Sequence, residues 1–216
     1  MPETTTPAAA AKAEAEPVTV AALGDSITAG NPLYDPDPAA RVRLGFGEEE
    51  RSQYEYWATE SEPGYLFTNC GVFGERTDEI AARLDQCSEG AHVLLVQGGI
   101  NDIAQGVPVE TASENLRAMV QAGKQAGQTV VLVDILPWNN GHPGADAPIA
   151  ELNEEIARIA AEEKVELLRF HDALEDPDEP GVMASGLTDD GDHPSIEGYR
   201  RLGELFPPPE ELIGSG

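Results

Sequence analysis

The chain has 216 residues, and its 40 Asp and Glu residues against 13 Lys and Arg residues give a formal net charge of −27 at pH 7. This length suits one domain with a well-buried core. A chain this acidic repels nucleic-acid phosphates and anionic membrane surfaces, so we expect neither as a partner. No apolar run approaches the roughly 18 residues that a membrane-spanning helix needs.

The first 16 residues are rich in Ala, Thr, Pro and Glu and predict a disordered tail. They lack the cationic start and long apolar region of a signal peptide, so we expect a cytoplasmic protein, or a secreted one if a leader has been removed. Short apolar runs then predict strands at 18–23, 65–70, 91–97, 129–134 and 165–170. Apolar residues at helical spacing predict helices at 76–86, 108–126, 147–163 and 194–205, and a long loop at 31–62 is expected to hold a short helix near 54–59.

Strands that alternate with helices and are apolar on both faces indicate a parallel sheet covered on each side. The expected fold is therefore α/β, a three-layer α/β/α sandwich with a five-stranded parallel sheet. We expect the domain to span 17–206, with a Pro-rich tail at 207–216. In such sheets the chemistry sits at the carboxyl ends of the strands.

The two cysteines, Cys70 and Cys87, are predicted to be free thiols. Cys70 ends the second strand, and a helix of about three turns would carry Cys87 roughly 15 Å away, towards the opposite edge of the sheet. A disulfide needs Cα atoms within about 7 Å. The pair also lacks the spacing of metal ligands, and we expect no metal site.

Two glycine-rich turns follow the first two strands. The turn at 24–30 presents Ser26 at the carboxyl edge of the sheet, among small neighbours that would admit a substrate carbonyl. The turn at 69–77 exposes backbone N–H groups, which can donate to a developing oxyanion. Taken alone, each turn is more often a simple helix cap or an ordinary loop.

Two polar blocks lie at the same expected edge. Asn101 follows the third strand, and its side-chain amide can supply a second donor, while Asp102 is expected to hold the loop by hydrogen bonds. Asp190 lies three residues before His193, ahead of the last helix. At that spacing a carboxylate can fix the imidazole tautomer and leave the other ring nitrogen to take a serine proton.

These four blocks, in this order, resemble the SGNH hydrolase superfamily, also called GDSL lipases or esterases, over about 18–205. The resemblance implies a flavodoxin-like fold and a serine hydrolase with Ser26 as nucleophile and His193 and Asp190 as its proton-handling partners. It also implies an oxyanion hole formed by the Ser26 N–H, the Gly74 N–H and the Asn101 amide.

The chain departs from the family pattern in two mild ways. It reads GDSI rather than GDSL at 24–27, and Phe73 precedes Gly74 where many relatives have a small residue. Neither change removes a reacting group.

The implied reaction is acyl transfer through an acyl-enzyme, without metal or cofactor. The expected substrate is a small-molecule ester with a short-chain or soluble acyl group, including acetyl esters of carbohydrates. A lysophospholipase or an acyl-thioesterase with the same triad is the alternative within enzymes, and a non-catalytic binding protein on this fold is the alternative outside them. A nucleotide-binding module is disfavoured, because the chain contains no phosphate-loop motif.

Aromatic residues are the candidates for the wall of the substrate pocket, namely Phe73, Trp138, Tyr54 and Trp57. For the residues within the insert at 31–62, plain packing of the insert is the competing interpretation.

Overall fold

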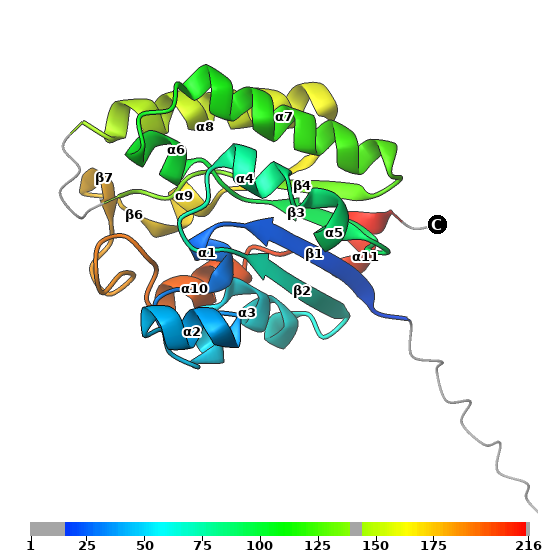
Figure 1. Cartoon of the computed structure of the whole chain (residues 1–216), viewed down its shortest axis with the longest axis horizontal. Helices are drawn as coiled ribbons and strands as arrows, with labels where there is room; N and C mark the ends of the chain where they lie inside the picture. Colours follow the sequence, from blue (N-terminus) through cyan, green and yellow to red (C-terminus); the bar gives the residue numbers. More distant parts are fainter. Residues whose placement is uncertain (1–15, 139–143, 215–216) are drawn as a thin grey trace, which may run out of the picture.

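A parallel sheet forms the centre of the molecule, with the strand order β2-β1-β3-β4-β5 (Figure 1). The computed structural model describes residues 16–138 and 144–214, so the expected N-terminal tail lies outside the described residues except for its last residue. The strands are β1 (Val18–Gly24), β2 (Tyr65–Gly71), β3 (Val93–Val96), β4 (Thr129–Val133) and β5 (Glu166–Leu168). All neighbouring strands pair in parallel, which confirms the predicted five-stranded sheet. The fifth strand is shorter than expected, because a helix begins at Phe170.

Helices cover both faces of this sheet. They are α1 (Ser26–Ala29), α2 (Pro38–Leu44), the 3-10 helix η1 (Glu50–Ser52), α3 (Tyr54–Ser61), α4 (Thr77–Ala81), α5 (Leu84–Ser88), α6 (Ile100–Ala104), α7 (Val109–Gln125), α8 (Asp146–Glu163), α9 (Phe170–Leu174), α10 (Ile196–Gly203) and α11 (Pro209–Ile213). The predicted helices corresponding to α3, α7, α8 and α10 are confirmed. The helices that sequence reasoning missed are short, and one turn or two show little periodicity.

Two further elements differ from the expectation. β6 (Glu175–Asp176) and β7 (Glu179–Met183) form an antiparallel hairpin between α9 and the segment that leads to His193. Where a tail was expected at 207–216, α11 forms and buries Pro209. Among the helices of the described residues, none combines the length and the apolar character that crossing a bilayer requires.

Each face of the sheet has its own apolar core. Along β1, Val20 and Ala22 belong to the core shared with α3 and α10, whereas Ala21 and Leu23 belong to the core shared with α4, α5, α7 and α8. The two helical layers lie on opposite sides of the sheet (Figure 1). Because both faces are covered, the central strands β1, β3 and β4 are buried along nearly their whole length rather than in alternation, and the three-layer prediction is confirmed.

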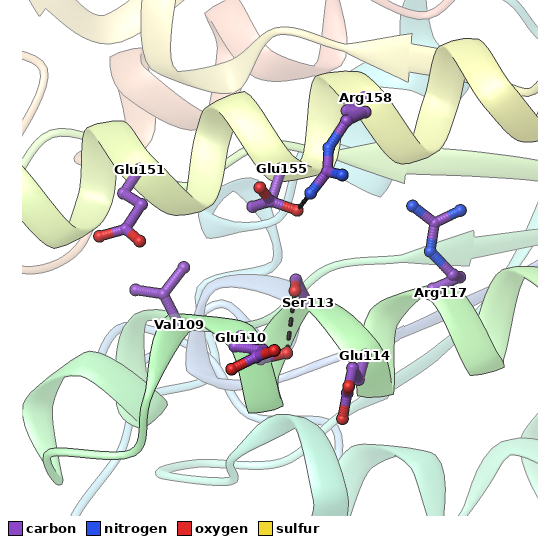
Figure 2. A pocket seen from close by; sticks show the side chains of 8 residues that line it. All are labelled: Val109, Glu110, Ser113, Glu114, Arg117, Glu151, Glu155 and Arg158. Carbon is purple, nitrogen blue, oxygen red and sulfur yellow. Dashed lines mark hydrogen bonds and ion pairs between the residues drawn. The ribbon is translucent and has the colours of Figure 1, made fainter.

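A groove of about 420 Å³ runs between α7 and α8 on the outer side of one layer (Figure 2). Its lining carries both signs of charge, from Glu110, Glu114, Arg117, Glu151, Glu155 and Arg158. Arg117 pairs with Glu162 at 2.7 Å, and Arg158 pairs with Glu155. The groove shares no residue with the four sequence blocks, so it lies outside the expected chemistry.

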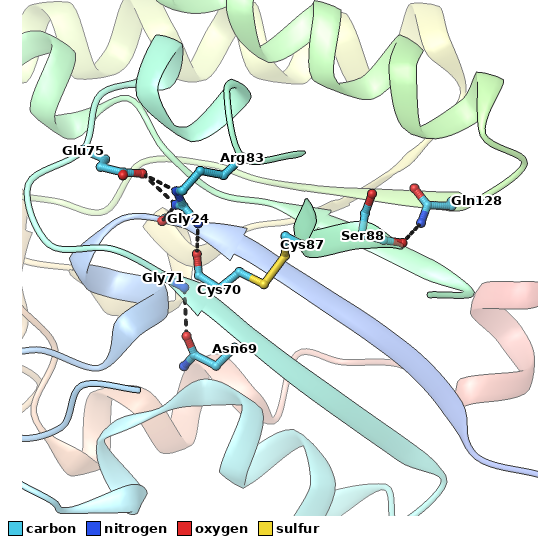
Figure 3. The surroundings of a disulfide bond; sticks show 9 residues. All are labelled: Gly24, Asn69, Cys70, Gly71, Glu75, Arg83, Cys87, Ser88 and Gln128. Carbon is cyan, nitrogen blue, oxygen red and sulfur yellow. Dashed lines mark hydrogen bonds and ion pairs between the residues drawn. A yellow bond between two sulfur atoms is a disulfide. The ribbon is translucent and has the colours of Figure 1, made fainter. Parts of the chain in front are cut away.

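The prediction of free cysteines is wrong, because Cys70 and Cys87 form a disulfide with Cα atoms 6.1 Å apart (Figure 3). The expected single helix at 76–86 is two short helices, α4 and α5, which meet near Arg83. The chain first passes beyond the carboxyl edge of the sheet, where the Thr77 N–H donates to Asp102 after the end of β3. Because the chain returns from beyond this edge, α4 and α5 place Cys87 beside Cys70, near the carboxyl end of β2, rather than at the opposite edge of the sheet.

Candidate active site

Ser26 begins α1 directly after β1, at the carboxyl edge of the sheet. The preceding Asp25 caps this helix, since its Oδ1 accepts from the Ile27 N–H at 2.9 Å. Burial raises the pKa of Asp25 to about 6, against the lowering effect of its hydrogen bonds and of nearby His193. The Asp25 N–H donates to Gln97 Oε1 at 3.2 Å, so the residue that follows the neighbouring strand β3 also holds this turn. Ser26 is 6% exposed.

Strand β2 packs closely against α1. A Cβ added at Gly71 would stand 2.1 Å from the Ala29 nitrogen, so only glycine fits between the strand and the helix. Asn69 Nδ2 donates to the Thr28 carbonyl at 2.8 Å, and Asn69 Oδ1 accepts from the Gly71 N–H at 2.9 Å. The Asn-x-Gly sequence at the end of the second strand therefore positions the helix that carries Ser26.

A buried hydroxyl network supports α1 from the core side. Thr28 Oγ1 donates to Gln97 Oε1 at 2.9 Å and lies 2.9 Å from the Tyr54 hydroxyl. The Thr28 proton is committed to Gln97, so the Tyr54 O–H is the donor in the second bond. Tyr54 is fully buried and stacks near Phe206, and burial raises its pKa well above the ordinary value. Tyr54 thus packs in the core, which corrects its expected place on a pocket wall.

The segment before α10 brings His193 to the same edge. His193 Nε2 lies 3.0 Å from Ser26 Oγ, and His193 Nδ1 lies 2.9 Å from Asp190 Oδ2. Asp190 Oδ1 also accepts from the backbone N–H groups of Asp192 at 2.8 Å and His193 at 2.7 Å. Partial burial raises the pKa of Asp190, but the hydrogen bonds from the His193 backbone, the His193 ring and the Asp192 backbone outweigh it and leave the pKa below its ordinary value. This carboxylate can therefore fix the ring with Nδ1–H towards it and a free lone pair on Nε2 towards the serine.

The loop around His193 is itself held by side chains. Thr188 Oγ1 donates to the His193 carbonyl at 2.8 Å and accepts from the Gly191 N–H at 2.9 Å. Trp138, which follows β4, donates its indole N–H to Asp192. Trp138 is thereby placed beside the loop that carries His193.

Two of the three expected oxyanion donors, Gly74 and Asn101, lie on segments that contact each other. Asn101 is in α6, and its Nδ2 donates to the carbonyl of Glu75, the residue after Gly74, at 3.0 Å. Gly74 has a φ of 79°, and among the described residues nothing beyond its chain neighbours lies within 4 Å of where a Cβ would stand. The Gly74 turn is therefore uncrowded on the side where a side chain would stand.

Asp102 binds Thr77, in the segment that follows Gly74, and so holds this loop by hydrogen bonds as expected. Its two carboxylate oxygens accept from the Thr77 hydroxyl at 2.7 Å and the Thr77 N–H at 2.9 Å. Burial raises the pKa of Asp102, against these hydrogen bonds. The carboxylate is occupied with the loop.

The remaining aromatic candidates separate into two groups. Phe73 is 48% exposed, and its ring meets that of Phe46 edge-on at 5.2 Å, next to Gly74. Trp57 instead donates its indole N–H to the Arg51 carbonyl at 2.8 Å and packs against Gly203 of α10. Phe73 and Trp138 thus lie beside the site, whereas Trp57 packs between the insert and α10, which corrects its expected role.

Three residues of this region were missed from the sequence. Gln97 directly follows the apolar strand β3 as a buried polar residue, and its place after four apolar residues is a signal that the sequence carries. Glu75 and Arg83 form an ion pair of 2.6 Å beside Gly74, but nothing in a helical stretch distinguishes Arg83 beforehand. In residues 16–138 and 144–214, no cluster of His, Cys, Asp or Glu has the arrangement of a metal site.

Nearly the whole described chain is similar to known proteins. The model of the GDSL-like Lipase/Acylhydrolase family matches residues 22–201. No curated protein matches the chain in sequence.

Solved structures resemble the chain over most of its length. A protein assigned to the lipolytic G-D-S-L family, from Desulfitobacterium hafniense DCB-2, is 25% identical with a TM-score of 0.73, covering 87% of this chain and 97% of that one. A member of the lipolytic protein G-D-S-L family from Veillonella parvula DSM 2008 is 20% identical with a TM-score of 0.69, covering 87% and 94%. A variant of an acetyl-xylooligosaccharide esterase from Geobacillus Stearmophilus is 18% identical with a TM-score of 0.68, covering 93% and 96%.

Proposed function

Because the chain belongs to the GDSL-like lipase/acylhydrolase family and is a serine ester hydrolase, we propose that Ser26 cleaves esters of short-chain or soluble acyl groups through an acyl-enzyme. The observation that carries this proposal is the hydrogen-bonded series from Ser26 Oγ to His193 Nε2, at 3.0 Å, and from His193 Nδ1 to Asp190, at 2.9 Å. A hydroxyl, an imidazole and a carboxylate in this order are the groups that nucleophilic acyl transfer requires.

In the first half of the reaction, His193 Nε2 takes the Ser26 proton as Oγ bonds to the ester carbonyl carbon. The carbonyl π electrons move to its oxygen, which becomes the oxyanion. The N–H groups of Ser26 and Gly74 and the Asn101 amide would stabilise this charge. As the tetrahedral intermediate collapses, the C–O bond to the alcohol breaks and His193 returns the proton to the leaving oxygen.

In the second half, a water molecule takes the place of the alcohol. His193 removes one proton from the water while the water oxygen bonds to the acyl carbon. When this second tetrahedral intermediate collapses, the bond from the acyl carbon to Ser26 Oγ breaks, and His193 returns the proton to Oγ. Asp190 stays ionised throughout and stabilises the imidazolium that forms in each half. Its lowered pKa suits this role.

The surroundings of the site support a small acyl group. Beside Gly74 stand the rings of Phe46 and Phe73, a pair that offers a short apolar face open to solvent. Trp138 stands near the loop of His193. An acetyl ester of a carbohydrate fits such a site, and one structural neighbour is an acetyl-xylooligosaccharide esterase.

The disulfide bears on location. Structural disulfides persist in oxidising compartments and are rare in the reducing cytoplasm. The Cys70–Cys87 bond therefore favours export rather than the cytoplasmic location expected from the sequence. Alkylation of the acid-quenched protein from its source cells would report two blocked sulfurs in an exported protein and two reactive thiols in a cytoplasmic one.

A fluorophosphonate probe, which reacts with activated serines, tests the assignment of the nucleophile. We expect the wild type to be labelled and to hydrolyse p-nitrophenyl acetate, and Ser26→Ala to do neither. Ser113→Ala is the matched control, because Ser113 is 7% exposed and bonds to the Glu110 carbonyl one turn back in α7. Labelling that persists in Ser26→Ala would refute the assignment.

A substrate panel then identifies the ester. We expect kcat/KM to be highest for p-nitrophenyl acetate and acetylated xylo-oligosaccharides, and at least about tenfold lower for lysophospholipid and acyl-CoA. A preference for either of the last two would replace the proposed substrate while leaving the mechanism intact.

A further inference from the structure

An ion pair stands directly beside the Gly74 turn. Glu75 follows Gly74 in the chain, and its Oε2 accepts from Arg83 Nε at 2.9 Å and from Nη2 at 2.6 Å. The side chains of Arg83 and Glu75 are only 26% and 19% exposed. This pair is therefore better shielded from solvent than most of the ion pairs on this acidic surface.

The same guanidinium also binds the ends of two strands. Arg83 Nη1 donates to the Cys70 carbonyl at 2.9 Å, and Nη2 donates to the Gly24 carbonyl at 3.2 Å (Figure 3). Gly24 closes β1, two residues before Ser26, and Cys70 lies near the end of β2. One side chain thus links the strand that leads to the nucleophile with the residue after Gly74.

The link extends to the other expected donor through the backbone of Glu75. The Glu75 carbonyl accepts from Asn101 Nδ2 at 3.0 Å. An amide nitrogen carries two hydrogens in one plane, so this bond fixes the direction of the second hydrogen. The position of Glu75 therefore bears directly on the Asn101 amide, and Glu75 is the chain neighbour of Gly74.

We propose that Glu75 and Arg83 are positioning residues that hold the oxyanion hole in its productive geometry, an inference that rests on the proposed function. Oxyanion donors act only when they are already aimed at the developing charge, and an error of about 1 Å can cost about a hundredfold in rate. Arg83 suits this task because a planar guanidinium binds a carboxylate and two carbonyls at once, which a lysine ammonium on a flexible stem does not reproduce.

The Cys70–Cys87 disulfide reinforces this arrangement. Cys87 lies one helical turn after Arg83, and its N–H donates to the Arg83 carbonyl at 3.0 Å. The bond to Cys70 ties this turn to the strand whose carbonyl Arg83 binds. The backbone that carries Arg83 is therefore fixed covalently as well as by packing.

Steady-state kinetics of Glu75→Gln and Arg83→Lys test this inference. Both variants keep the approximate size of the side chain and disrupt the paired bonds from the guanidinium to Glu75 Oε2, and we expect kcat to fall about 10- to 100-fold while KM changes less than about twofold. Affinity for an alkyl boronic acid, whose adduct with Ser26 mimics the tetrahedral intermediate, should fall in parallel with kcat. The pH midpoint of kcat/KM should not move, because the bonds of His193 are untouched.

Arg117→Lys is the matched control, since Arg117 lines the groove between α7 and α8 and forms its ion pair there with Glu162. It should retain the wild-type kcat and boronate affinity, and circular dichroism should show all three variants folded. The inference is overturned if Glu75→Gln and Arg83→Lys lose no more kcat than Arg117→Lys, or if kcat falls while boronate affinity stays unchanged. A wild type that neither hydrolyses esters nor reacts with fluorophosphonate would instead refute the proposed function.

Discussion

Replacing Cys70 and Cys87 together by alanine would remove the covalent link between β2 and α5. The two residues are separated by 17 positions in sequence. In the chain-entropy model, opening a loop of this length lowers the free energy of unfolding by about 3 kcal/mol at 25 °C, because the unfolded chain regains the entropy that the cross-link removed. For a domain of this size, the loss corresponds to a fall of about 6–12 °C in Tm.

Guanidinium unfolding of the oxidised wild type, the reduced wild type and the double variant measures this contribution. The reduced wild type and the double variant should unfold at the same, lower denaturant concentration, and only the wild type should respond to reductant. Thiol titration of the denatured protein should find two thiols after reduction and none before it. Equal midpoints for oxidised and reduced protein, or two thiols in the unreduced protein, would refute this reasoning.

Three further changes probe the site and its supports. Asp190→Asn should lower kcat roughly 10²- to 10⁴-fold in ester hydrolysis with little loss of stability, because an amide no longer fixes the tautomer of His193. Gly71→Ala should abolish fluorophosphonate labelling and lower Tm, because its Cβ would stand 2.1 Å from the backbone nitrogen of Ala29. Asp134→Asn should raise the free energy of unfolding above pH 6 by up to about 3 kcal/mol, since burial raises the pKa of Asp134 to about 6.

The sign of the Asp134 effect follows from proton binding. Between pH 3.8, the ordinary pKa of Asp134, and about pH 6, the folded protein holds a proton on Asp134 that the unfolded chain has released. The contribution of Asp134 to the free energy of unfolding therefore falls as the pH rises through that window. The amide that replaces this carboxylate in Asp134→Asn can still accept from the His171 N–H, a bond of 2.8 Å in the wild type. Denaturant unfolding at pH 4 and pH 8 should therefore show a difference between the proteins at pH 8 that shrinks at pH 4, and a constant difference would contradict this account.

The other two changes have equally direct controls. Gly90→Ala serves as the comparison for Gly71→Ala, because Gly90 has a φ of 74° but among the described residues nothing crowds its added Cβ. It should cost only about 1 kcal/mol and leave labelling intact. For Asp190→Asn, a kcat within about twofold of the wild type would show that the backbone alone orients His193.

The parallel sheet and the placement of the candidate site residues could be predicted from the sequence. Apolar runs such as 129–134 are buried on both faces, and this property is local to the run. Once the sheet is parallel, every strand ends at the same edge, so Ser26 and Asn101 share that edge whatever the details of packing. Asp190 and His193 are three residues apart, and their hydrogen bond depends on one turn of chain.

Only the tertiary structure decided the contacts that depend on how far a loop travels before it turns back. Cys87 lies beside Cys70 because α4 begins beyond the carboxyl edge of the sheet. A helix length taken from periodicity does not tell how far beyond that edge the helix begins. The hydrogen bond from Arg83 to Gly24 joins residues that are 59 positions apart in sequence. Tyr54 is buried in the core, where its hydroxyl bonds to Thr28, and does not line a pocket. Local patterns report the burial and the period of a segment, whereas contacts between distant segments follow from the packing of whole elements against each other.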